Sequence, residues 1–337
     1  MSNLHYYIIG NTAEGLINHL DPNLHNINQI ITLSHPSSWL KTAIIKKLTE
    51  QYNQSNLEIL ESALGNDYLD GFIIRDQSLA FIDSRIATTS TANLNLEETF
   101  PAREQGMMEI HRLTQKAYDS FAKGLKVHDD LEEIYMNQMD FDHADQFAVN
   151  FIADLFHNIP KKEHTPHTYN RLFGTNTADG IVNVVPHLFE NIKTVHYIKG
   201  RAGTGKSTFM KKIAGACTDH GFDVELYFCS FDPNSVDMVL VRDLDFCIFD
   251  STDPHAFFPE REGEVIVDLY EELVPGTDEK YETEINDLNV RYKSYMKEGI
   301  GYLKMAGHHR DQIEDQYIKT ITEADIGDAV QTIQLNL

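Results

Sequence analysis

The sequence predicts an α/β protein of two tandem domains, each a mostly parallel sheet with helices on both faces, followed by a helical arm. Three observations predict this class. A long stretch of sequence recurs in the second half of the chain, apolar strand-like segments alternate with helical ones, and each copy ends in a charged amphipathic stretch. At 337 residues, the chain has room for two domains of ordinary size.

The repeat keeps its register over most of each copy. Residues 11–15, Asn-Thr-Ala-Glu-Gly, recur 165 residues later as Asn-Thr-Ala-Asp-Gly at 176–180. After a slip of two residues the spacing is 167, which pairs Glu58 with Glu225, Asp70 with Asp237, and Asp83 with Asp250. A repeat of this length indicates tandem domains rather than a solenoid. We expect domains at residues 1–160 and 167–337, joined by a polar stretch with two prolines.

Each copy has the same expected order of elements. A helix comes first, capped by Asn11 in one copy and by Asn176 in the other, because each asparagine has an acid three residues on. The helical arms are expected at about 100–157 and about 263–325. The expected strands are 29–33, 57–61, 71–74 and 79–82 in the first copy, and 194–198, 224–228, 238–241 and 246–249 in the second.

One strand-to-helix junction carries a complete phosphate-binding pattern. Residues 200–207 read Gly-Arg-Ala-Gly-Thr-Gly-Lys-Ser, between the apolar strand and a helix. Glycines permit positive φ and let backbone N–H groups converge on phosphate oxygens. A chance match in a chain this long has a frequency on the order of 1%. We expect a P-loop that binds a nucleoside triphosphate, ATP, through Gly200, Arg201, Ala202, Gly203, Thr204, Gly205, Lys206, Ser207 and Thr208.

Three side chains at this junction have expected chemical roles. Lys206 would neutralise the β- and γ-phosphates, and Ser207 would be a ligand of Mg²⁺. Asp250 ends an apolar strand, as a Walker B acid does, and would hold the Mg²⁺ through water. The next residue is Ser251 rather than Glu, so the base that would activate water is not at its usual position.

Three further residues are candidates for catalysis. Asp232 follows the second strand of its copy, and Asp253 and His255 follow Asp250 closely. Either acid would orient a water molecule or an acceptor hydroxyl, and His255 would bind a phosphate or transfer a proton. Since Asp-Pro pairs also start turns, both acids have a structural alternative.

The matching position in the first copy has lost the pattern. Residues 35–42 read His-Pro-Ser-Ser-Trp-Leu-Lys-Thr, so Lys41 aligns with Lys206 and every glycine is gone. Pro36 lacks a backbone donor, and Trp39 places bulk where phosphate would approach the backbone. We expect this copy not to bind a triphosphate in the usual manner, which leaves one site in the C-terminal half.

With these motifs, the chain resembles a bacterial family of tandem P-loop ATPases along nearly its whole length. Members tend to show a strand-end Cys-Ser-x-Asp-Pro, which residues 229–233 match. They also show Asp-Gly-Thr-x-Pro-His, which residues 250–255 match with Ser251 in place of glycine, and the His-x-x-x-Glu-x-x-Tyr of residues 128–135 fits as well. The resemblance implies a P-loop fold and ATP binding and supplies no specific reaction. The first copy departs most from the family.

Composition excludes some partners. The net charge of -24 opposes binding to nucleic acid or to an anionic membrane, and no apolar run approaches the length of a membrane span. The three cysteines have no CxxC spacing, and the N-terminus lacks a signal-peptide pattern, so we expect a cytoplasmic protein. The sequence indicates no specific protein partner or oligomeric state.

Three functions fit the expected site. The first is Mg²⁺-dependent ATP hydrolysis. The second is a small-molecule or nucleotide kinase, in which Arg242, Arg261, Arg291 and Arg310 would clamp phosphates. The third is a non-catalytic nucleotide-dependent sensor or scaffold. A GTPase and an ABC-type ATPase are disfavoured, because the chain has no Asn-Lys-x-Asp and no LSGGQ-like motif.

Overall fold

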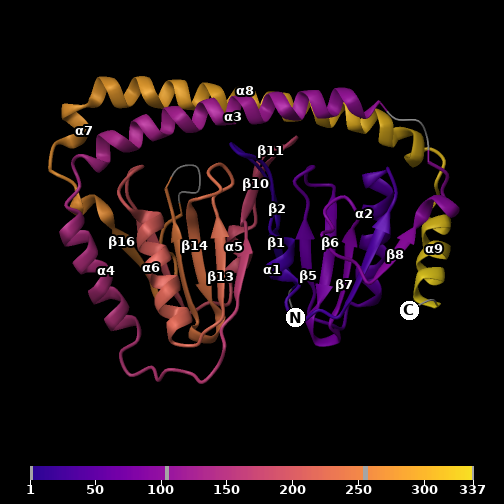
Figure 1. Ribbon diagram of the computed structural model, residues 1–337, viewed down its shortest axis with the longest axis horizontal. Helices are drawn as coiled ribbons and strands as arrows, with labels where there is room; N and C mark the ends of the chain where they lie inside the picture. The colour runs from indigo at the N-terminus through magenta and orange to yellow at the C-terminus, as the bar shows by residue number, and fades with distance from the viewer. Residues whose placement is uncertain (1–2, 103–105, 253–256, 336–337) are drawn as a thin grey trace. The chain divides into compact units, whose positions relative to one another are not determined.

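The structure, a computed structural model, describes residues 3–102, 106–252 and 257–335. Within them the chain forms two six-stranded, mostly parallel sheets flanked by helices, with a helical arm after each (Figure 1). The predicted α/β class is therefore confirmed.

The first sheet has the strand order β1-β5-β6-β7-β4-β8. β6 runs antiparallel to both of its neighbours, and the other neighbouring strands are parallel. All four expected strands are present, and the short edge strands β1 and β8 were not predicted. The strands are β1 (Leu4–Tyr7), β4 (Gln29–Ser34), β5 (Glu58–Glu61), β6 (Leu69–Ile74), β7 (Leu79–Asp83) and β8 (Ala92–Asn95).

The second sheet repeats this topology in the order β16-β12-β15-β14-β13-β9, with β14 as the antiparallel strand. An ion pair is repeated as well, since Arg75 contacts Glu58 in the first sheet and Arg242 contacts Glu225 in the second. The strands are β9 (Thr168–Arg171), β12 (Thr194–Lys199), β13 (Val224–Phe228), β14 (Val236–Val241), β15 (Phe246–Asp250) and β16 (Glu264–Asp268).

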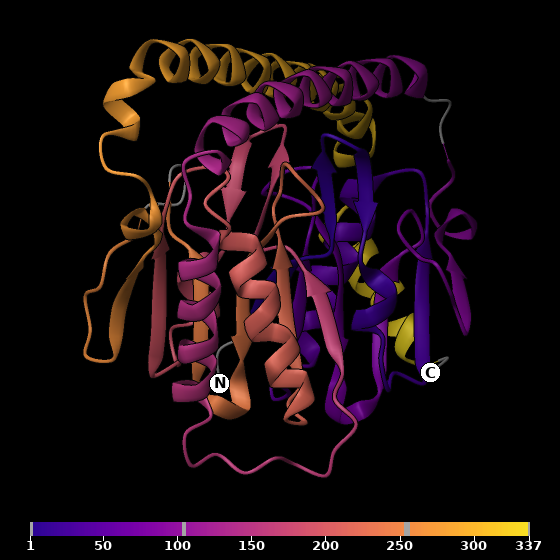
Figure 2. The ribbon, with the colours of Figure 1, turned by 60° about the vertical axis from the view of Figure 1, so that its left-hand side comes forward.

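In each sheet, the helix after the loop position is covered by a helix from a distant part of the sequence. α2 (Ser38–Gln51) packs on β6 and is covered by α9 (Glu323–Leu335). α6 (Lys206–Asp219) packs on β14 and is covered by α4 (Phe141–Leu155), which Figure 2 shows beside it. Apolar side chains of these helices belong to the core of their sheet, which fixes the position of the loop before α2 and before α6.

The two compact units of the chain are not contiguous halves. One contains residues 1–119, 173–188 and 298–337, and the other contains 120–172 and 189–297. Two of the four boundaries fall inside the long arm helices α3 (Met107–Met136) and α8 (Glu282–Ile318), so each unit takes part of each of these helices. The expected ranges 1–160 and 167–337 follow the duplication along the sequence, whereas compactness follows the packing of α4 and α9.

The helix expected at the start of each copy is a β-hairpin, and this prediction was wrong. β2 (Ile9–Thr12) pairs with β3 (Gly15–Asn18), and β10 (Gly174–Thr177) pairs with β11 (Gly180–Asn183). Gly15 and Gly180 have φ of +101° and +110°, which glycine adopts without strain. The Glu14 N–H donates to the Thr12 hydroxyl at 3.2 Å, so the expected capping acid lies in a tight turn.

Asn11 and Asn176 do not cap helices but bind each other's backbone. The Asn11 side-chain amide donates to the Asn176 carbonyl oxygen at 2.7 Å, and the Asn176 amide donates to the Asn11 carbonyl oxygen at 3.0 Å. These equivalent residues therefore form a reciprocal pair within the first compact unit. Asparagine is favoured both at helix N-caps and in turns, because its side chain binds nearby backbone in either setting.

The described residues also include short α-helices. They are α1 (Leu20–Asn23), α5 (Val185–Leu188) and α7 (Thr277–Lys280). Among the described residues, no helix combines the length and the apolar character that a membrane crossing requires.

His196 in β12 should make the stability of the second unit sensitive to acid. Its ring packs against Phe151 and Phe246, with centroids 5.1 and 5.3 Å away, and burial lowers the pKa of His196 to about 4. Between pH 6.5 and pH 4 the unfolded chain binds more protons than the folded chain does. The free energy of unfolding therefore decreases as the pH is lowered through this range. At pH 5 the loss is about 2 kcal/mol.

Urea denaturation at pH 7.5 and pH 5 should show a smaller acid loss in His196→Phe than in the wild type. The exposed His111 gives the matched control, since His111→Phe should keep the full loss. An unchanged acid loss in His196→Phe would contradict this account of the buried imidazole.

Candidate functional site

The glycines between β12 and α6 are required by the backbone. Gly203 and Gly205 have φ of +73° and +82°, and Gly205 is the residue that caps α6. A Cβ at Gly200 would lie 2.6 Å from the Thr204 hydroxyl oxygen, which is too close. The loop therefore has the backbone conformation that only its glycine pattern permits.

The structure brings Lys206 and Asp250 together. The Lys206 ammonium donates to the carbonyl oxygens of Gly200 and Arg201 at 3.0 and 2.7 Å, and it lies 3.6 Å from the Asp250 carboxylate. β12 and β15 are parallel neighbours with Ile198 opposite Asp250, which places the strand-end acid beside the loop. The Asp250 carboxylate also accepts from the Thr252 N–H at 3.1 Å.

Ser207 and Thr208 lie in the first turn of α6. The Ser207 hydroxyl accepts from the Val236 N–H at 2.9 Å, and Thr208 is exposed. The first copy keeps the equivalent bond, because the Thr42 hydroxyl accepts from the Leu69 N–H at 3.1 Å. The link between the helix start and the antiparallel strand has therefore survived in both copies.

Asp237 in β14 is a second acid at this place, and the sequence reasoning did not assign it a role. Burial, reinforced by the negative charge of Asp250, raises the pKa of Asp237 to about 7, and Lys206 opposes the rise. Its side chain also hydrogen-bonds the Cys229 thiol. An acid inside an otherwise apolar strand was the available signal, since the repeat already aligned Asp237 with Asp70.

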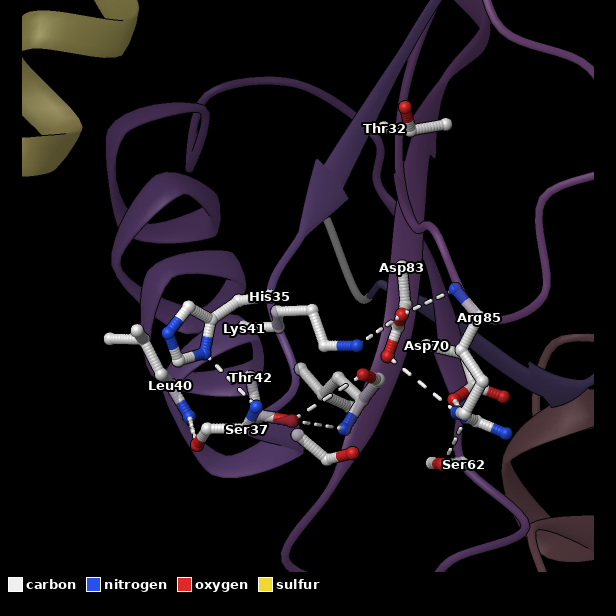
Figure 3. Close-up of polar contacts among 12 residues, drawn as sticks. Thr32, His35, Ser37, Leu40, Lys41, Thr42, Ser62, Asp70, Asp83 and Arg85 are labelled. Carbon is white, nitrogen blue, oxygen red and sulfur yellow. Dashed lines mark hydrogen bonds and ion pairs between the residues drawn. The ribbon is translucent and has the colours of Figure 1, made fainter. Parts of the chain in front are cut away.

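In the first copy the equivalent acids, Asp70 and Asp83, are in contact with two cations, Lys41 and Arg85 (Figure 3). The Lys41 ammonium lies 2.6 Å from the Asp83 carboxylate, with side chains only 4% and 2% exposed. The Arg85 guanidinium contacts Asp70 and lies 3.7 Å from Asp83. Burial raises the pKa of Asp70 to about 6, and the Arg85 charge opposes the rise.

The two copies differ in charge at one position beside these acids. Arg85 aligns with Thr252 at the spacing of 167 residues, so the second copy has a threonine in place of this guanidinium, near Asp237, Asp250 and Lys206. Lys199 is near, but its ammonium donates to the carbonyl oxygens of Ser251 and Phe257, at 2.5 and 2.8 Å. At the position of Arg85 the second copy therefore lacks the positive charge that the first copy has.

The arm lies directly on the intact loop. A Cβ at Gly203 would be 2.5 Å from the Glu132 carbonyl oxygen of α3, so the glycine also permits this approach. Ala202 packs against an apolar cluster from both arm helices, formed by Val127, Leu131, Tyr135 and Leu288.

Charged and polar groups add to this contact between the arm and the loop. The Arg201 guanidinium contacts the Asp278 carboxylate at 2.5 Å. That carboxylate also accepts from the Tyr135 hydroxyl at 2.9 Å. Tyr135 is buried.

Of the three remaining candidates, Asp232 lies among the described residues. Asp232 accepts from the Asn234 N–H at 2.9 Å, which is the turn role, and its charge helps burial to raise the pKa of Asp129 in α3. Asp253 and His255 lie outside the described residues.

The arginines that a kinase would use as a phosphate clamp have protein partners of their own. Arg242 contacts Glu225, Arg261 contacts Glu264, and Arg291 lies 3.6 Å from Asp287. Arg310 belongs to the other compact unit, where it donates to the Leu64 carbonyl oxygen at 3.2 Å.

Comparisons with known proteins give little further information. No family model matches the chain, and no solved structure matches it significantly. The chain is similar to baculoviral IAP repeat-containing protein 1b of Mus musculus, with 25% identity over 142 residues. That match covers 42% of this chain and 8% of the relative, so the chain spans only a small part of the relative's length.

The role of the Arg85 guanidinium can be tested by exchanging Arg85 and Thr252 between the copies. Arg85→Thr should lower the free energy of unfolding by about 3 kcal/mol at pH 7.5, because it removes the guanidinium that contacts the buried Asp70 carboxylate. The cost should shrink at pH 5, where Asp70, with its pKa raised to about 6, is protonated.

The reciprocal variant is the matched control. Thr252→Arg adds a guanidinium beside Asp237 and Asp250 and should not lower stability in urea denaturation. Equal stability of Arg85→Thr and the wild type at pH 7.5 would show that the guanidinium does not balance these acids.

Proposed function

We propose that the C-terminal half binds one Mg²⁺–ATP at residues 200–208 and hydrolyses it. One observation carries the proposal. Lys206, in a glycine loop that opens α6, lies 3.6 Å from Asp250 and close enough to the buried Asp237 to oppose the rise of its pKa, and the second copy has Thr252 where Arg85 contacts the acids of the first copy. A divalent cation with a bound polyphosphate supplies both the missing positive charge and an anion for the helix start.

The donor set fits Mg²⁺, which prefers hard oxygen ligands. The Ser207 hydroxyl and the Asp250 carboxylate would hold it, with Asp237 adding negative charge nearby. When bound, the metal neutralises charge on the phosphate oxygens and orients them. The loop and β15 would thus supply the protein ligands, and phosphate oxygens and water would complete the octahedral coordination.

Lys206 is placed to act on the phosphates. Its present partners are two neutral carbonyl oxygens, so exchanging them for charged phosphate oxygens strengthens its hydrogen bonds. Backbone N–H groups of residues 203–208 and the positive end of α6 would bind the remaining phosphate oxygens.

Hydrolysis also needs a group that orients the attacking water. Asp232 lies near Asp129, which α3 brings to this end of the sheet. Either carboxylate would accept a hydrogen bond from the water that attacks the γ-phosphorus. Asp253 and His255 keep the roles expected from the sequence.

A nucleotide-dependent sensor is the second candidate, and Ser251 favours it. This position follows the strand-end acid, where many ATPases carry a glutamate, yet the Ser251 hydroxyl donates to the Phe257 carbonyl oxygen at 2.7 Å. The contact of α3 with Gly203 would let phosphate binding change the packing of the arm without any chemistry.

The cell compartment and the excluded partners belong to the same proposal. Cys217, Cys229 and Cys247 are free thiols, which fits the reducing cytoplasm. The net charge of -24 opposes a nucleic-acid partner.

Phosphate release with Mg²⁺–ATP tests the function directly. Lys206→Ala should abolish hydrolysis and weaken ATP binding by more than about tenfold, because it removes the charge that faces the phosphates. Lys212→Ala is the matched control on the same helix, since Lys212 forms an ion pair with the surface residue Asp145, and it should behave as wild type.

Each other result has a definite meaning. ATP binding in Lys206→Ala that equals wild type would contradict the site itself. Binding by wild type without phosphate release would replace hydrolysis by the sensor. Phosphate transfer that depends on an added nucleoside or sugar would identify a kinase.

A further inference from the structure

The loop position of the first copy holds a carboxylate from the chain itself. Glu314 of α8 accepts from the Ser38 N–H at 2.7 Å and also accepts a hydrogen bond from the Ser37 hydroxyl. Glu314 is only 3% exposed, and both serines are buried. All three residues belong to the same compact unit.

This carboxylate occupies the place that an anion takes at a phosphate-binding loop. Ser37 and Ser38 align with Ala202 and Gly203 of the intact loop. Ser38 begins α2, a helix of 14 residues whose first N–H groups and dipole favour negative charge. Lys41, which aligns with the phosphate lysine, is turned to Asp83 instead.

The other donors at this position are also taken within the chain. The Ser37 N–H donates to Nδ1 of His35 at 3.0 Å, and the Leu40 N–H donates to the Ser37 hydroxyl oxygen at 3.0 Å. The His35 ring is held in turn by the Phe100 carbonyl oxygen at 2.9 Å and by the edge of Tyr317. Each of these N–H groups, which would otherwise be free for a phosphate oxygen, therefore has a partner.

The second copy has the same glutamate and uses it differently. The two arms share a Glu-x-x-Tyr, Glu132 with Tyr135 and Glu314 with Tyr317. The Glu132 carboxylate lies 3.7 Å from His128, and the Glu132 backbone lies against the loop at Gly203. In the first copy the arm supplies an anion to the start of the helix. In the second copy the equivalent carboxylate lies beside a histidine instead.

We propose that Glu314 is a built-in anion, which takes the place of phosphate in the first copy, closes that copy to nucleotides and fastens α8 to α2. This inference concerns the first copy and does not depend on hydrolysis in the second. The cost of burying the charge is offset by the amide, the hydroxyl and the helix start.

Rescue by small anions tests the proposal. Glu314→Ala should lower the melting temperature by roughly 5 °C, because it leaves buried donors without an acceptor. Sodium formate, compared with sodium chloride at equal ionic strength, should restore at least half of the loss in Glu314→Ala and leave the wild type unchanged. Inorganic phosphate should restore the loss as well if the freed space admits it, and rescue by either anion supports the proposal.

Two further variants make the outcome decisive. Ser37→Ala with Glu314→Ala should lose most of the rescue, since one of the anion's donors is gone. Glu314→Gln keeps the shape and an acceptor but removes the charge, and it should melt below wild type even if Glu314→Ala fails to fold. A Glu314→Gln protein as stable as wild type, or a destabilised Glu314→Ala protein that no anion rescues, would overturn the proposal.

Discussion

Two neighbouring acids on adjacent strands of each sheet impose the constraint on which the rest of the structure depends. A carboxylate enclosed between strands needs a compensating positive charge or must bind a proton. Asp70 and Asp83 meet this need with Arg85 and Lys41, in a network with little exposure to water. In the second copy Lys206 lies 3.6 Å from Asp250, the position of Arg85 is taken by Thr252, and burial together with the charge of Asp250 raises the pKa of Asp237.

The same comparison extends to negative charge at the helix start. Both copies keep the sheet topology and the bond between the Ser or Thr hydroxyl and the antiparallel strand. The two copies differ in the source of the positive and the negative charge at these positions. In our proposals the first copy carries both charges covalently, as Arg85 and Glu314, whereas the second recruits them as Mg²⁺ and phosphate. On this account, the loss of glycines in the first loop is part of a change from a site that binds a ligand to a site that holds two helices together.

Much of the fold was predictable from the sequence, because long apolar strands and a glycine-rich loop have strong local patterns. The hairpins at Asn11 and Asn176 were not, since residues that cap helices also favour turns. The edge strands β1, β8, β9 and β16 are short and partly exposed, so their apolar pattern is weak. The packing of α4 and α9 could not be predicted, because an amphipathic face does not specify which sheet it covers.

The candidate site divides in the same way. The loop, Lys206 and Asp250 follow from one motif and its spacing, and the structure brings them together. Asp237 could have been found by asking why an acid recurs inside an apolar strand of both copies. Glu314 could not, since it is 276 residues from Ser38 and only the folded chain places it there. Long-range polar contacts leave little trace in one sequence.

The number of nucleotides bound per chain tests the central claim most directly. Native mass spectrometry of the full chain with Mg²⁺ and a non-hydrolysable ATP analogue should show one nucleotide per chain. Two nucleotides per chain would contradict the account, because the first copy would then be open, and so would one that persists when Lys206 is replaced by alanine.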